Sequence, residues 1–158
     1  MADEEQAVLD EDLKGYKAKI TPTPKALMTW NSGLYFTGMT LQGYEIEFDA
    51  NAQMGCKPTE ALLLSLAGCM AIDIVNILQK MRIRMEGFRM ELKGERNPEP
   101  PQYFRNIEFV MHISGKGLEP RKVDRAVSLS RDKYCSVYNS LRKDLDFKVS
   151  YVLDEKGP

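Results

Sequence analysis

Apolar and polar residues alternate along several stretches of the chain, a pattern typical of strands that bury one face. The clearest run covers residues 103–115, where Ile107, Phe109, Met111 and Ile113 share one face. Alternation recurs in four further stretches, residues 15–21, 42–50, 85–96 and 145–153. The two long runs that flank the Pro-rich connection "NPEPPQ" predict an antiparallel hairpin.

A second hairpin is predicted over residues 25–39, because the segment "NSG" at its centre is typical of a turn. Residues 57–81, "KPTEALLLSLAGCMAIDIVNILQKM", are instead a long apolar run that predicts a helix, with Pro58 in its first turn. This run is nearly long enough to span a bilayer, but Ser65, Asp73 and Asn76 interrupt it. We therefore expect a buried helix and no membrane association.

A second helix is predicted over residues 117–135, followed by a short helix in residues 136–144. The order of elements is then strands, long helix, strand pair, helix and strand. This order predicts an α+β fold with a mostly antiparallel sheet.

The length and the charge of the chain indicate how many domains it has and which partners it is not expected to bind. The 158 residues suit one domain, which we place at residues 13–158, and the acidic residues 1–12 are expected to be disordered or frayed. The net charge of -1 gives no electrostatic basis for binding nucleic acid or an anionic membrane. The N-terminus lacks the apolar core of a secretory signal, and three cysteines do not suit a secreted disulfide scaffold. We therefore expect a cytoplasmic protein.

Cys69 lies near the middle of the long predicted helix. At about 100° per residue it falls on a polar stripe together with Ser65, Asp73, Asn76 and Lys80. Asp73 is one turn further along, within side-chain reach of Cys69. Cys69 is thus either a small residue on a wet face or a working thiol, and the helix alone does not decide between these. For Asp73 we expect a partly exposed carboxylate paired with a lysine or an arginine.

The other cysteines have different surroundings. Cys135 follows the second predicted helix, where Arg131, Lys133 and the start of a short helix would favour its thiolate; a loop thiol without a role is the alternative. Cys56 lies in a loop and is interpreted as incidental. Three cysteines with one histidine, His112, match no zinc spacing, and His112 itself is expected on a strand surface. No glycine-rich phosphate loop precedes a helix, so neither a metal nor a nucleotide cofactor is expected.

Two segments carry a family resemblance, "KPTEALLLSLAGCMAIDIVNILQKM" and "RDKYCSVYNSL". In this order, with a strand hairpin between them, they resemble the OsmC-like family, which comprises osmotically inducible and organic-hydroperoxide-resistance proteins. The resemblance runs from Tyr16 to Leu153 and implies an OsmC-like fold, with a long central helix in an intertwined homodimer. It also implies a thiol peroxidase without metal or haem. Cys69 matches the peroxidatic position and Cys135 the resolving one, with reduction by a dithiol partner such as a lipoylated or thioredoxin-like protein.

The chain departs from the peroxidase subgroups of this family at two places. Those subgroups have a glutamate directly after the proline that starts the helix, where this chain has Thr59 and then Glu60. On the helical wheel Glu60 lies roughly opposite Cys69, so we interpret it as stabilising the helix dipole. The subgroups also use an arginine from an early loop, whereas residues 24–56 contain none. Three arginines elsewhere are candidates for the activating charge, Arg82, Arg84 and Arg131.

Two hypotheses follow. In the first, the protein is a cysteine-based peroxidase that reduces organic hydroperoxides in oxidative-stress defence, with Cys69 attacking the peroxide and Cys135 resolving the product. In the second, it is a non-catalytic dimeric protein that binds a small apolar or thiol ligand at the subunit interface. Two sulfur atoms far apart, with no cation near Cys69, would favour the second.

Overall fold

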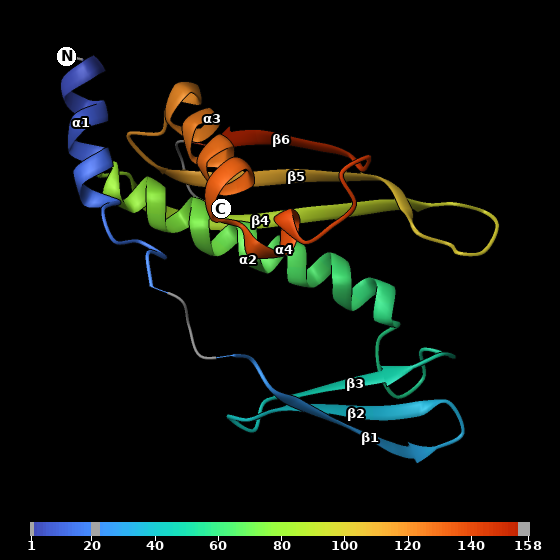
Figure 1. Cartoon of the computed structure of the whole chain (residues 1–158). Coiled ribbons are helices and arrows are strands. Elements are labelled where there is room, and N and C mark those ends of the chain that lie inside the picture. Colours follow the sequence, from blue (N-terminus) through green and yellow to red (C-terminus); the bar gives the residue numbers. More distant parts are fainter. Residues whose placement is uncertain (1, 20–22, 155–158) are drawn as a thin grey trace. The chain divides into compact units, whose positions relative to one another are not determined.

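The computed structural model of this chain describes residues 2–19 and 23–154, and its fold is α+β (Figure 1). Its helices are α1 (Ala2–Asp12), α2 (Pro58–Lys80), α3 (Pro120–Leu129), a π-helical turn η1 (Ser130–Tyr134) and α4 (Ser136–Asn139). Its strands are β1 (Ala26–Ser32), β2 (Tyr35–Thr40), β3 (Glu45–Asp49), β4 (Arg84–Arg96), β5 (Phe104–Lys116) and β6 (Asp146–Asp154).

The strands form two three-stranded sheets, in the orders β1-β2-β3 and β4-β5-β6. All pairs are antiparallel except β5 with β6, which is parallel, so the predicted mostly antiparallel α+β fold is confirmed. The chain forms two compact units, Ala18–Leu64 and Met1–Lys17 with Ser65–Pro158, where the sequence led us to expect one domain over residues 13–158.

The predicted core strand and helix supply most of the buried side chains of the larger unit. Within it, α2 and α3 lie on the same side of the β4-β5-β6 sheet (Figure 1). The largest fully buried apolar side chains of α2, β5 and α3 are Leu66, Met70, Ile74, Ile77, Leu78, Ile107, Phe109, Met111, Ile113 and Val123. The face of β5 that alternation predicted is therefore the face that is buried.

Local patterns located most elements. Both hairpins are confirmed, with Ser32 paired to Tyr35 across the first turn and Phe88 paired to Ile113 in the second. The predicted second helix is present but changes to a π-helical turn after Leu129. The strand predicted over residues 15–21 is wrong for residues 15–19, which form a turn and a bend, and residues 20 and 21 lie outside the described residues.

The N-terminal segment also differs from its expectation of a frayed or disordered end over residues 1–12. The structure has helix α1 over Ala2–Asp12, with Leu9 only 4% exposed, and residue 1 lies outside the described residues. Lys80 of α2 donates a hydrogen bond to the carbonyl of Asp12 (2.7 Å), and Arg125 of α3 lies 4.0 Å from the carboxylate of Asp10. Tertiary contacts therefore hold a segment whose composition alone favours disorder.

Of the helices described, α2 is the one long and apolar enough to cross a bilayer. The core helices of soluble proteins have the same length and composition. Because Leu66, Met70 and Ile74 of α2 are fully buried inside the protein, we keep the interpretation of α2 as a core helix.

Candidate thiol site

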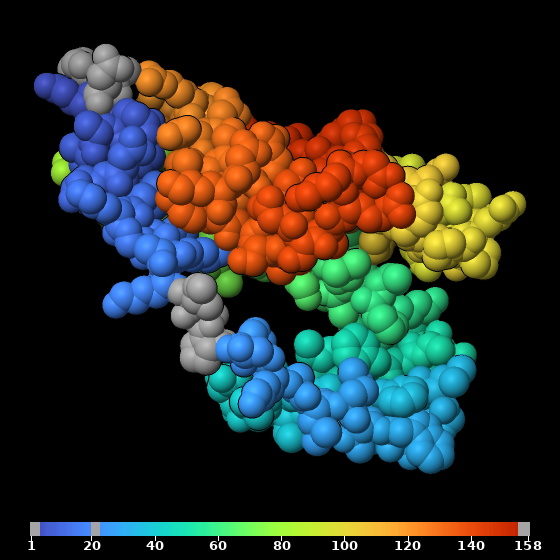
Figure 2. Space-filling view, in the orientation of Figure 1, coloured from blue at the N-terminus to red at the C-terminus, as the bar shows by residue number. Residues whose placement is uncertain are grey.

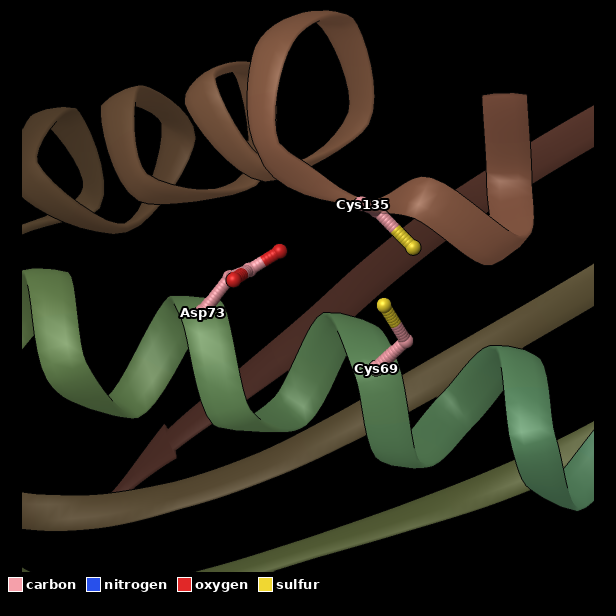
Figure 3. Close-up of side chains that lie close together, drawn as sticks. All are labelled: Cys69, Asp73 and Cys135. Atoms are coloured by element: carbon pink, nitrogen blue, oxygen red, sulfur yellow. The ribbon is translucent and has the colours of Figure 1, made fainter. Parts of the chain in front are cut away.

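The two cysteines singled out in the sequence lie next to each other in the larger unit (Figure 3). Cys69 is a partly exposed residue of α2, and Cys135 is a buried residue between η1 and α4. Their sulfur atoms and a carboxylate oxygen of Asp73 all lie within 4.8 Å of one another, and both thiols are free. Figure 3 shows the two sulfurs directed toward each other. A disulfide bond is about 2.0 Å long, so the two sulfur atoms must move closer together before they can form one.

Asp73, one helical turn after Cys69, is completely buried. Tyr16 donates its hydroxyl to Oδ1 at 2.6 Å, and Lys17 Nζ lies 2.8 Å from the same oxygen. Ser130 donates its hydroxyl to Oδ2 at 3.0 Å. The expected lysine partner is therefore present, but the expected partial exposure is wrong, because the N-terminal turn and η1 cover this carboxylate.

Burial of the Tyr16 hydroxyl, together with its hydrogen bond to the Asp73 carboxylate, raises the pKa of Tyr16 well above its usual value. Tyr16 therefore remains protonated and keeps donating to Asp73 at neutral pH. Its ring also packs edge-on against Tyr134, with 5.0 Å between the ring centroids. These contacts connect the N-terminal turn to the segment that carries Cys135.

The π-helical turn η1 determines where Cys135 lies. The backbone N–H of Cys135 donates to the carbonyl of Ser130, five residues earlier, at 2.7 Å. The wider turn directs the Ser130 hydroxyl at Asp73 and ends the helix at Cys135. Asn139 then donates its side-chain amide to the carbonyls of Arg131 (3.0 Å) and Cys135 (2.9 Å), which fixes this backbone.

Burial raises the pKa of Cys135 to about 12, and the neighbouring Cys69 and Asp73 act in the same direction. The backbone N–H of Tyr138, which donates to the Cys135 sulfur at 3.3 Å, opposes this shift but does not overcome it. The prediction that nearby positive charge favours a Cys135 thiolate is therefore wrong. Arg131 is turned toward the carboxylate of Asp132, at 2.6 Å.

Lys17 is the cation that the structure brings to this site, and it was not among the three candidate arginines. Arg131 pairs with Asp132, Arg82 lines a cavity beside α1, and Arg84 starts strand β4. In contrast, Lys17 holds the carboxylate beside both thiols and also donates to the carbonyl of Tyr134 at 3.0 Å.

The remaining candidates lie where the sequence predicted them. Glu60 accepts the backbone N–H of Lys57 at 2.8 Å, so it stabilises the start of α2 as expected. His112 lies on the sheet with its Nε2 atom 3.0 Å from a carboxylate oxygen of Glu91. Cys56 forms a hydrogen bond to the carbonyl of Glu47 within the smaller unit.

Cys69, Asp73 and Cys135 offer three donor atoms at a spacing that could hold a metal ion. Their chemistry does not fit a resident metal, however. Lys17 already places a positive charge on the Asp73 carboxylate, and this charge would repel a metal cation bound there. The three residues therefore fit a thiol site better than a metal centre.

Comparison with known proteins identifies the family. A family model described as OsmC-like protein matches residues 48–150. The chain belongs to the OsmC-like protein family. A relative in this comparison, Protein YhfA of Escherichia coli (strain K12), is 38% identical over 128 residues, which are 80% of this chain and 96% of YhfA.

Solved structures agree with this family assignment. A hypothetical protein from Aquifex aeolicus VF5 matches with a TM-score of 0.77 and 29% identity, over 85% of this chain and 98% of that one. An organic hydroperoxide resistance protein OsmC from Legionella pneumophila matches with a TM-score of 0.60 and 18% identity, over 84% and 98% of the two chains. At that identity the Legionella likeness shows a shared OsmC-like fold alone.

Three residues of the site were not found from the sequence, namely Tyr16, Lys17 and Ser130. Tyr16 and Lys17 were assigned to a strand on the basis of alternation, and Ser130 lay inside a predicted helix without a distinctive neighbour. The available signal was indirect: a carboxylate, Asp73, within a long apolar helix indicates a partner of opposite charge. No local pattern says which lysine that partner is.

Proposed function

We propose that this OsmC-like protein is a cysteine-based peroxidase that reduces organic hydroperoxides in defence against oxidative stress. Cys69 is the attacking thiol and Cys135 the resolving thiol. The observation that supports this most is that both free sulfur atoms lie within 4.8 Å of each other although 66 residues apart in sequence (135 − 69). This arrangement suits a two-step reaction that ends in a disulfide.

The chemistry balances with these two thiols. The Cys69 thiolate attacks the O–O bond of the hydroperoxide and becomes a sulfenic acid, while the other oxygen takes a proton and leaves as an alcohol. The Cys135 thiol then condenses with this sulfenic acid, which forms the disulfide and releases water. A dithiol reductant restores both thiols and is itself oxidised to a disulfide. No metal or other cofactor takes part.

The surroundings of the sulfurs support this division of roles. Cys69 is partly exposed and can meet a substrate, whereas Cys135 is completely buried. The raised pKa of Cys135 keeps it as a thiol, which makes it a poor first nucleophile. It becomes reactive only when Cys69 has been converted to an electrophilic sulfenic acid beside it.

We also propose a homodimer, as the family resemblance implies, and a cytoplasmic location, as the sequence led us to expect. An exposed apolar side chain of the larger unit supports a dimer. Ile72 on α2 is 67% exposed, although the helix has buried residues on both sides of it in sequence. A large apolar side chain in this position is typical of a surface that a second subunit covers. The reductant is proposed to be a lipoylated or thioredoxin-like dithiol protein.

Peroxide consumption tests the proposal. Purified protein is mixed with cumene hydroperoxide and dithiothreitol, and the loss of peroxide is compared for the wild type, Cys69→Ser and Cys56→Ser. We expect Cys69→Ser to be inactive and Cys56→Ser to match the wild type. Equal rates for the wild type and Cys69→Ser would remove the basis for the assignment.

The second hypothesis, a non-catalytic protein that binds an apolar or thiol ligand, is favoured by one observation. The buried Asp73 carboxylate lies beside both sulfurs, where it opposes a second negative charge. Calorimetry with a small thiol such as N-acetylcysteine separates the two functions. Saturable binding to a protein that consumes no peroxide would support the binding function.

A further inference from the structure

The thiol site includes a turn from the N-terminal part of the chain, residues 13–17. Leu13 is buried, and the backbone N–H of Tyr16 donates to its carbonyl at 2.9 Å. Gly15 has φ +86° and Lys17 has φ +52°, so two of these five residues adopt the left-handed backbone conformation. The turn thereby directs two successive side chains, Tyr16 and Lys17, at the same carboxylate oxygen of Asp73.

The conformation of Lys17 is unfavourable by itself, since a residue with a β-carbon in the left-handed region costs about 1 kcal/mol or more. The compensating contacts come from the lysine side chain. Its ammonium lies 2.8 Å from Asp73 Oδ1 and 3.0 Å from the carbonyl of Tyr134, the residue before Cys135. Strained residues of this kind concentrate at functional sites, and the ammonium of Lys17 lies at the thiol site.

The charge matters because of what surrounds Cys69. The carboxylate of Asp73 is completely buried and lies within 4.8 Å of both sulfurs, so a thiolate at Cys69 would add a second negative charge beside it. The other ionisable groups around the site are the Tyr16 and Tyr134 hydroxyls, the Cys135 thiol, and Lys133, whose ammonium lies 5.1 Å from the ring centre of Tyr134. Among the residues that the structure describes, Lys17 is the cation with an ion pair to this carboxylate.

We infer that Lys17 is a positioning residue of the thiol site that neutralises Asp73, so that Cys69 can ionise beside a buried carboxylate. Asp73 in turn anchors the N-terminal turn and η1 around the sulfurs through Tyr16 and Ser130. This inference rests on the proposed function and deepens it, by naming the charge that permits the attacking thiolate.

The pH profile of Cys69 alkylation tests this inference without any peroxide. The reaction with iodoacetamide is followed by mass spectrometry of the peptide that carries Cys69, in a Cys56→Ser background. We expect Lys17→Met to raise the midpoint of the profile by about one pH unit, which makes alkylation near neutral pH about tenfold slower. Lys17→Arg is expected to stay within about threefold of the parent, and Lys19→Met, an exposed lysine two residues away, to match it.

A double variant separates a role of charge from a role in structure. If the shift arises from an unneutralised carboxylate, then Lys17→Met combined with Asp73→Asn is expected to return the midpoint toward that of the parent. If Lys17 merely holds the turn in place, the double variant will remain as slow as Lys17→Met, and the inference is overturned. The inference is also overturned if Lys17→Met leaves the midpoint of Cys69 alkylation at the value of the parent protein.

Folding is checked in the same experiment, because the buried Cys135 becomes alkylated as fast as Cys69 when the site opens. Should Lys17→Met open the site, Lys17→Gln replaces it, since its amide keeps a hydrogen-bond donor without the charge. A parental midpoint in Lys17→Gln again overturns the inference. The two proposals can fail separately. If the protein consumes no peroxide but the alkylation midpoints shift as expected, the proposed peroxidase function is refuted and the role of Lys17 stands.

Discussion

Replacing Asp73 with asparagine tests the network that holds the thiol site together. The substitution keeps the shape of the side chain and removes its charge. The carboxylate accepts hydrogen bonds from Tyr16 and Ser130 and an ion pair from Lys17, with contacts of 2.6, 3.0 and 2.8 Å. An asparagine keeps one acceptor oxygen and turns a donor toward the remaining partners.

The expected loss of stability follows from these contacts. A hydrogen bond to a charged group contributes about 1.5–3 kcal/mol, and breaking a fully buried ion pair costs about 3–5 kcal/mol. Lys17 is 35% exposed and can turn its ammonium toward water, which lowers the second figure. For Asp73→Asn we therefore expect the free energy of unfolding to fall by about 2–3 kcal/mol.

Urea unfolding followed by circular dichroism measures this change, with both proteins reduced and at the same concentration. The matched control is Asp144→Asn, whose exposed carboxylate accepts two hydrogen bonds from Arg142 at 2.9 and 2.6 Å. We expect the control to leave the free energy of unfolding almost unchanged, because solvent screens this exposed pair. If Asp73→Asn changes stability as little as the control does, the buried network does not stabilise the fold and the reasoning above fails.

Three further predictions follow from the site. Cys135→Ser is expected to leave Cys69 as a sulfenic acid after peroxide treatment, which dimedone labelling detects; a wild-type level of labelling would contradict the resolving role. Because burial raises the pKa of Cys135 to about 12, the folded state keeps a proton that the unfolded state loses earlier. The resulting stability is complete below the ordinary thiol pKa and is lost as pH rises toward about 12, so Cys135→Ala should flatten the fall in unfolding free energy over this alkaline range. Ile72→Glu is expected to turn the proposed dimer into a monomer in sedimentation velocity, and an unchanged sedimentation coefficient would argue against a dimer through this face of α2.

The sequence by itself determined the elements whose pattern is local. Alternation located β4, β5 and β6, and the long, largely apolar run located α2 with its start at Pro58. Strand alternation and helical periodicity depend on which residues face one packed surface, so they are visible within a few neighbouring positions. Cys69 could be assigned to the polar stripe of α2 for the same reason, and the motif around Cys135 supported a partner thiol through the family resemblance.

Only the tertiary structure decided how the thiols are surrounded. It buried Asp73, which the sequence led us to expect partly exposed, by covering it with the N-terminal turn and η1. It also made Lys17 the partner of that carboxylate, although 56 residues separate them (73 − 17). Neither contact has a local signature in the sequence. The strength of a buried charge pair depends on the distance between the charges in space and on the exclusion of water. The spacing of residues along the chain determines neither of these.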